Sequence, residues 1–127
     1  MRQSIFAVGA LLLAPLAGAH HSFAIYDMQT EQEFVGVVDT LKFRNPHMSM
    51  TLREEKDGAE RIVNFVEGAP ANMLVRMEGF DPDFIAPGQR ITAIGSPRRD
   101  NPEAFFLKAI ILEDGTRFDA LRPGQTR

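Results

Sequence analysis

The chain has 127 residues, the length of one domain, since a domain commonly holds about 150 residues. It carries 14 Lys and Arg against 17 Asp and Glu, a net charge of −3, and 44% of its residues are hydrophobic, which excludes disordered, collagen-like and coiled-coil classes. It contains no cysteine, which excludes a disulfide scaffold, a thiolate zinc site, a cysteine nucleophile and a lipoprotein anchor.

The first 19 residues have the pattern of a cleavable export signal. A positive start at Met1-Arg2 is followed by an apolar stretch from Ile5 to Leu16, and Ala17-Gly18-Ala19 matches the small-residue cleavage pattern. The apolar stretch is well short of the roughly 20 residues that span a bilayer. We therefore expect residues 1–19 to be removed and residues 20–127 to form a single domain in the bacterial periplasm, with no membrane span left.

The next segments have the patterns of strands. Residues 33–43 are rich in Val and Phe, and Gly36 within them suggests a bulge or a sharp bend in a long first strand. Residues 47–53 alternate, with Met48, Met50 and Leu52 on one face and His47 on the other, polar face. The polar turn around Gly58 joins this strand to residues 60–66 as a hairpin.

A short helix is predicted after Gly68-Ala69-Pro70, with an apolar stripe of Met73, Leu74 and Met77 and an end at Gly79. Further strands are predicted at residues 90–95 and 105–112 and near Phe118. A single helix between the third and fourth strands is typical of the OB fold. The predicted fold class is therefore mainly β: a small OB-like barrel of five to six strands with one short helix between strands 3 and 4.

Four segments together resemble a known family. They are HHSF from His20, NPH from Asn45, the helix entry GAPANML, and PGQRITAIGSP. The sequence is similar to a family of small exported proteobacterial proteins classed as a domain of unknown function, over about the whole mature chain. The resemblance implies an OB-like barrel in the periplasm and implies no particular reaction.

The three histidines, His20, His21 and His47, all occupy marked positions. After cleavage His20 would be the first residue, so that its α-amine and its imidazole could bind one metal ion. His47 would supply the opposing imidazole, and His21 either a third ligand or an outer partner. Nitrogen ligands of this kind suit Cu(II) best, with Zn(II) and Ni(II) behind it. In the simpler alternative, His47 shapes the turn and the N-terminal pair is a tail.

Met48 and Met50 form an M-x-M pair, and thioether ligands select Cu(I). In a regular strand, however, both side chains point away from the face that carries His47, and they share their own face with Leu52. This arrangement favours packing in the core, where methionine is a common gap-filler.

The sequence offers little for catalysis or for nucleic-acid binding. It has no G-x-S-x-G elbow, no phosphate loop and no dinucleotide fingerprint, so we expect a protein that is not an enzyme. The chain is acidic, and its marked basic pair, Arg98-Arg99, is followed by Asp100, which argues against nucleic acid as a partner.

Together these observations predict a non-enzymatic periplasmic binding module. Its most specific expected ligand is a metal ion, copper before zinc, held by the mature N-terminal histidines and His47. The alternative is a metal-free interaction module for an unknown envelope protein, in which HHSF docks as an ordered arm. The metal hypothesis requires this arm to lie within a few ångströms of His47.

Overall fold

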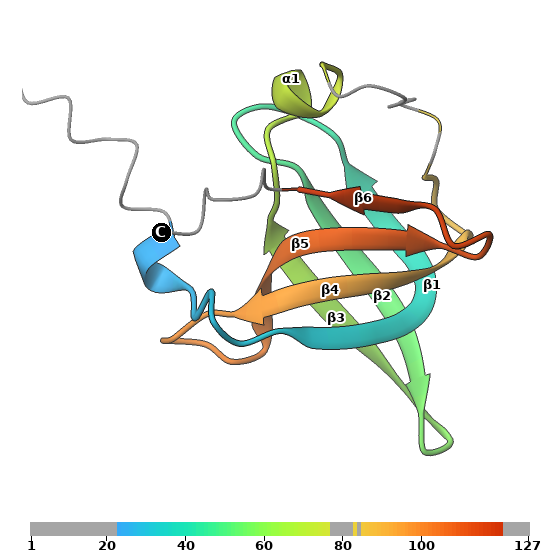
Figure 1. The fold of residues 1–127 in the computed structure, drawn as a ribbon. Coiled ribbons are helices and arrows are strands. Elements are labelled where there is room, and N and C mark those ends of the chain that lie inside the picture. Colours follow the sequence, from blue (N-terminus) through green and yellow to red (C-terminus); the bar gives the residue numbers. More distant parts are fainter. Residues whose placement is uncertain (1–22, 77–82, 84, 121–127) are drawn as a thin grey trace, which may run out of the picture.

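The structure is a computed structural model and describes residues 23–76, 83 and 85–120. Its elements follow in chain order (Figure 1): the 3-10 turn η1 (Phe23–Ile25), β1 (Gln32–Lys42), β2 (Ser49–Lys56), β3 (Ala59–Glu67), the helical turn α1 (Ala71–Leu74), β4 (Arg90–Pro97), β5 (Ala104–Leu112) and β6 (Arg117–Asp119). Every predicted strand is present, with ends shifted by a few residues at most.

Five of the strands close into a barrel, and β6 is an additional strand. The pairing order is β3-β2-β1-β4-β5-β6, and β3 also pairs with β5. The closing β3–β5 pairing is parallel and short, whereas the other strand pairs are antiparallel. Strand β5 pairs with β3 near its start and with β6 near its end, so that both halves of this strand edge are covered. The predicted mainly β barrel is thereby confirmed.

Strand β1 is long because it belongs to both sides of the barrel. Its first half pairs with β4 and its second half with β2, with Gly36 in both pairings. A bulge or a sharp bend was predicted at Gly36; the bulge lies at Asp39, where the register with β2 shifts. Gly36 instead permits a close approach, because a Cβ atom there would lie 2.3 Å from the carbonyl oxygen of Arg53.

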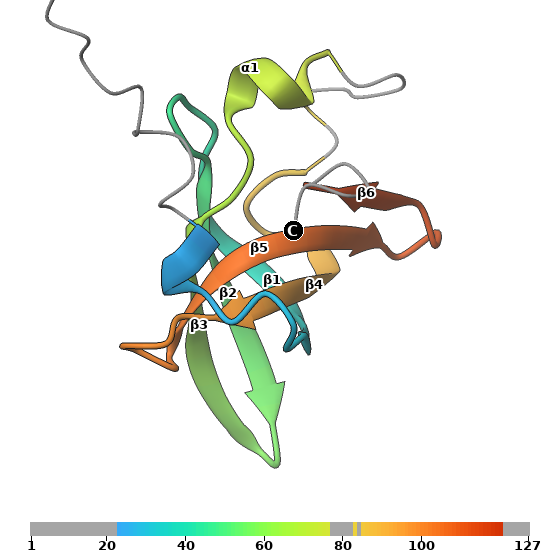
Figure 2. The same cartoon turned by 60° about the vertical axis from the view of Figure 1, so that its left-hand side comes forward.

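The β2–β3 hairpin forms as its turn residues predict. Asp57 and Gly58 both have positive φ angles, 54° and 75°, which a two-residue hairpin turn requires. The hairpin extends beyond the rest of the barrel (Figures 1 and 2), and its tip carries no core residue.

The core fills the barrel with side chains from alternate strand positions. Phe34, Phe65 and Phe105 meet there, with ring centroids 4.7–6.0 Å apart. The predicted core position of the methionine pair is confirmed, since Met48 and Met50 are 3% and 2% exposed and lie in the same cluster.

The helix predicted between strands 3 and 4 is reduced to a single turn. The helical turn α1 spans only Ala71–Leu74, which is too short for the predicted stripe ending at Met77. One turn gains little from its own hydrogen bonds, because helix nucleation is unfavourable and a helix of this length depends on tertiary contacts. The predicted helix end at Gly79 lies outside the described residues.

Among the described residues, no helix has the length and hydrophobicity needed to cross a membrane.

Candidate functional site

His47 lies in the loop between β1 and β2, and this loop is bonded to the chain around α1. The side-chain oxygen of Asn45 accepts a hydrogen bond from the backbone N–H of Asn72 (3.1 Å). The neighbouring residue Met48 exchanges backbone hydrogen bonds with Gly68 and Ala69, at 2.9 and 3.1 Å. The Asn45–Pro46 peptide bond is cis. These bonds hold His47 beside the end of β3.

The imidazole of His47 faces Glu67, the last residue of β3. Its Nδ1 atom lies 3.4 Å from Oε1 of Glu67, and its side chain is 42% exposed while that of Glu67 is 14% exposed. His47 is thus exposed and Met48 is buried, as predicted, although both residues precede β2.

The second oxygen of the same carboxylate contacts the N-terminal segment. The Tyr26 hydroxyl donates a hydrogen bond to Oε2 of Glu67 at 2.9 Å, across 41 positions of sequence. Tyr26 is 2% exposed. Glu67 therefore joins a residue of the N-terminal segment to the histidine of the β1–β2 loop.

Residues 23–31, which we call the arm, pack against the end of the barrel. The rings of Phe23 and Tyr26 each meet the ring of Phe106 edge to face, with centroids 5.5 Å apart. Backbone bonds flank this contact: Asp27 N–H donates to the Pro97 carbonyl and Arg99 N–H to the Ile25 carbonyl, both at 2.8 Å. Figure 2 shows η1, the start of the arm, at this end of the barrel.

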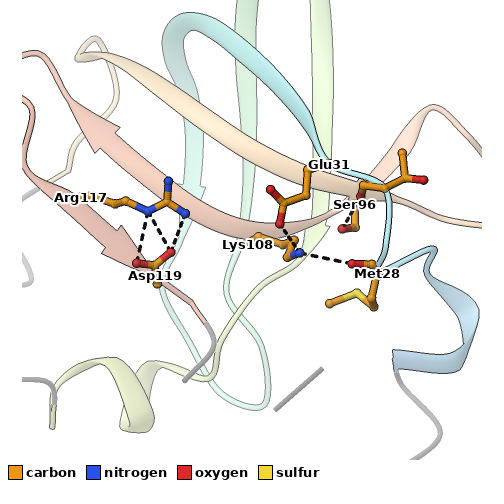
Figure 3. A network of polar contacts seen from close by, with 7 residues as sticks. Met28, Glu31, Ser96, Lys108, Arg117 and Asp119 are labelled. Carbon is orange, nitrogen blue, oxygen red and sulfur yellow. Dashed lines mark hydrogen bonds and ion pairs between the residues drawn. The ribbon is translucent and has the colours of Figure 1, made fainter. Parts of the chain in front are cut away.

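The other end of the arm is bonded to β4 and β5 (Figure 3). The ammonium group of Lys108 contacts the Glu31 carboxylate and donates to the Met28 carbonyl at 3.3 Å. The hydroxyl of Ser96, which is fully buried, donates to the Thr30 carbonyl at 2.8 Å. The arm is therefore bonded along most of its length.

Two ionisable groups of the arm respond to this packing. Burial and then the hydrogen bond to Glu67 raise the pKa of the Tyr26 phenol above its usual value. The Thr30 hydroxyl, and to a smaller extent the Arg99 guanidinium, lower the pKa of Asp27. Arg99 lies 3.6 Å from the Asp27 carboxylate. At neutral pH the phenol is neutral and Asp27 is charged.

Of the three predicted metal ligands, the structure describes His47. His20 and His21 lie outside the described residues, as does the predicted export signal. Within residues 23–76, 83 and 85–120, no group of three or more His, Cys, Asp or Glu side chains is arranged to hold a metal ion.

One surface hollow adjoins His47 and a second lies next to it. The first, of about 450 Å³, is lined by the β1–β2 loop from Arg44 to His47. The second, of about 240 Å³, runs across Thr40, Thr51 and Asn64. Ser49 and Val66 line both hollows.

Tyr26 and Glu67 are not among the site residues predicted from the sequence. A signal existed for Tyr26, because it is the single tyrosine of the chain and lies in the short segment after HHSF. The signal for Glu67 was weaker. In β3 every second residue from Val63 faces inwards, and Glu67 follows Val63 and Phe65 in this series, where a carboxylate is unexpected without a partner.

The fold and these contacts define a small, mainly β protein: a closed five-stranded barrel with an extra strand and a packed N-terminal arm. Residues 10–106 match the model of a family described as "Family of unknown function (DUF6152)", and the chain belongs to this family. The predicted resemblance to a family of unknown function is confirmed at this level. No curated protein and no solved structure matches the chain.

Proposed function

We propose that this protein is a non-enzymatic, OB-like periplasmic module that binds a divalent metal ion, copper before zinc. His20 supplies the N-terminal amine and an imidazole, and His47 supplies an opposing imidazole. His21 is a third ligand or an outer partner. The observation that carries the proposal is the carboxylate of Glu67, which contacts both His47 and the arm that leads to His20.

The surroundings of His47 support its role as a ligand. Histidines that bind metals usually present one ring nitrogen to the metal and the other to a carboxylate or a carbonyl, which orients the ring. Nδ1 of His47 has such a carboxylate at 3.4 Å, and the half-exposed ring leaves Nε2 for a ligand. A carboxylate at Nδ1 also raises the basicity of the other nitrogen.

The course of the arm supports the participation of His20. The hydroxyl of Tyr26 lies 2.9 Å from the carboxylate that His47 contacts. Residues 23–26 are held by η1 and by the packing of Phe23 and Tyr26 on Phe106, so the segment that can extend is the three residues from Phe23 back to His20. An extended chain spans at most about 3.6 Å per residue, so this segment can reach about 10 Å. The proposal requires the imidazole of His47 to lie within this reach.

Two further observations support the proposed compartment and the proposed class of barrel. The pattern of residues 1–19 supports export, and export with cleavage after Ala19 would create the free amine that the site needs. The barrel order, in which β1 pairs with β2 and β4 while β3 pairs with β5, supports the OB-like class.

The decisive experiment is calorimetric titration of the protein that begins at His20 with Cu(II) and with Zn(II). We expect one metal ion per chain, with Cu(II) bound more tightly than Zn(II). A matched protein whose His20 α-amine is acetylated keeps every side chain and loses only the terminal amine as a ligand. We expect its Cu(II) affinity to fall at least about tenfold, and that of His47→Gln likewise.

The same titration tests a second candidate, a metal-free interaction module for another envelope protein. The hollow beside His47 favours this candidate, because it places the apolar Val66, 43% exposed, next to Ser49 of β2. Weak metal binding that is indifferent to acetylation of the His20 amine would contradict the metal proposal and leave this candidate in its place.

A further inference from the structure

We infer that Tyr26 is a positioning residue for His47, and that it acts through Glu67 so that docking of the arm sets the orientation of the imidazole. The coupling itself concerns only described residues and holds without a metal. Its consequence for metal affinity rests on the proposed function.

The carboxylate of Glu67 has a different partner at each oxygen. Oε2 accepts the Tyr26 hydroxyl at 2.9 Å, and Oε1 lies 3.4 Å from Nδ1 of His47. A carboxylate is planar, so a donor that fixes one oxygen also fixes the direction of the other. The position of the phenol therefore determines whether Oε1 faces the imidazole.

A competing cation lies close to this carboxylate. The Arg98 guanidinium interacts electrostatically with both Tyr26 and Glu67, while its own hydrogen bonds are to the Asp100 carboxylate at 2.8 and 2.9 Å. Removal of the phenol hydroxyl takes away the hydrogen bond at Oε2, so that the attraction of Arg98 can turn the carboxylate away from His47.

The phenol is in turn held by the docked arm. The ring of Tyr26 packs on Phe106, and the next residue donates its backbone N–H to the Pro97 carbonyl. If the arm leaves the barrel, the hydroxyl leaves Glu67. Arm docking and imidazole orientation are therefore linked, and by reciprocity a ligand that requires the oriented imidazole also favours the docked arm.

The first test measures the tautomer of His47 in the metal-free protein by nitrogen NMR at about pH 9, where imidazoles are neutral. His47→Gln assigns the signal. In the wild type we expect the Nδ1–H form, because Nδ1 faces the carboxylate. In Tyr26→Phe, which keeps the packed ring, we expect the Nδ1–H population to fall. In Glu67→Ala, which removes the acceptor, we expect it to fall further.

Ser96→Ala is the matched control. It removes another hydroxyl that anchors the same arm, through the Thr30 carbonyl, and does not contact Glu67. We expect its tautomer population to be that of the wild type. An unchanged tautomer in Tyr26→Phe would overturn the inference, and so would an equal change in Ser96→Ala, because general loosening of the arm would then be sufficient.

The second test measures Cu(II) affinity in the same variants. We expect a loss of about 10- to 100-fold in Glu67→Ala, the usual effect of removing an outer partner of a ligand, and a smaller loss in Tyr26→Phe. We expect Tyr26→Phe to change affinity no further once Glu67 is replaced. Absence of metal binding in the wild type would refute the proposed function alone, since the tautomer measurement would still decide the coupling.

Discussion

Single residues at the end of the barrel take their roles from contacts that cross the fold. Glu67 is a shielded carboxylate whose cost of burial is offset by a phenol donor and a nearby imidazole. A second shielded carboxylate, that of Glu54, is paired with a cation instead. Its Oε2 atom lies 2.6 Å from Nε of Arg61, and the Arg61 guanidinium lies over the ring of Phe34. Each carboxylate is placed where the chain can supply a partner.

Tyr26 offers a direct measurement at this scale, because no other tyrosine contributes to its absorbance. Burial, the hydrogen bond to Glu67 and the charges of Glu67 and Asp100 raise its pKa, and Arg98 opposes them. We expect the phenol to ionise well above pH 10 in the native protein and near pH 10 in denaturant. Ultraviolet titration in both states measures this, and a native midpoint near 10 would contradict the buried, bonded phenol.

The same shift predicts how stability depends on pH. The native state holds the phenol proton more tightly than the unfolded state, so the contribution of Tyr26 is complete below about pH 10 and is lost as pH rises through the native pKa. Above about pH 10, the free energy of unfolding should therefore fall more in the wild type than in Tyr26→Phe. Urea unfolding at a series of pH values measures this difference.

At the scale of elements, the form of β1 determines how the barrel closes. The strand serves two partners, and the backbone of β2 approaches it most closely at Gly36. The bulge at Asp39 then turns the strand towards the loop that carries His47. The position of His47 thus depends on the course of β1.

Gly36→Ala should destabilise the protein by about 3 kcal/mol or more, because the added Cβ would meet backbone atoms of Arg53 that cannot move without disturbing the ladder. Gly58→Ala is the comparison: its Cβ would meet nothing within 4 Å, although φ there is positive. We expect it to cost about 1–2 kcal/mol. Urea unfolding of both variants measures the difference, and equal losses would show that the close approach is unimportant.

At the scale of the whole molecule, one aromatic cluster joins distant parts of the barrel. Phe34 from β1, Phe65 from β3 and Phe105 from β5 are in mutual contact, and Phe65 and Phe105 are partners in the closing parallel pair. The closing strand pair is short, so we expect this cluster to contribute much of the stability of the closure.

Phe65→Ala should therefore cost about 3–5 kcal/mol, a large part of the 5–15 kcal/mol that stabilises a typical domain. Its neighbour Val66 is 43% exposed, and Val66→Ala should change stability by about 0.5 kcal/mol or less. Denaturant unfolding compares the two, and a small loss in Phe65→Ala would mean that closure does not depend on the cluster.

Local patterns are sufficient to predict the strands, the β2–β3 hairpin, the burial of Met48 and Met50, and the exposure of His47. Side chains alternate along a strand, and Asp57-Gly58 suits a tight turn. The alternation of burial includes His47 and Met48, although β2 begins only at Ser49. The helix predicted from the sequence is longer than α1. An apolar stripe and a terminal glycine do not ensure that a helix extends beyond one turn.

The residues that surround His47 depend on the tertiary structure. Tyr26 and Glu67 are 41 positions apart, and they meet because the closed barrel brings the end of β3 beside the arm that packs on Phe106. No local pattern encodes such a contact, since it depends on how β1 is shared and on where β3 joins β5. The histidine was therefore visible in the sequence, and its carboxylate and phenol partners were visible only in the fold.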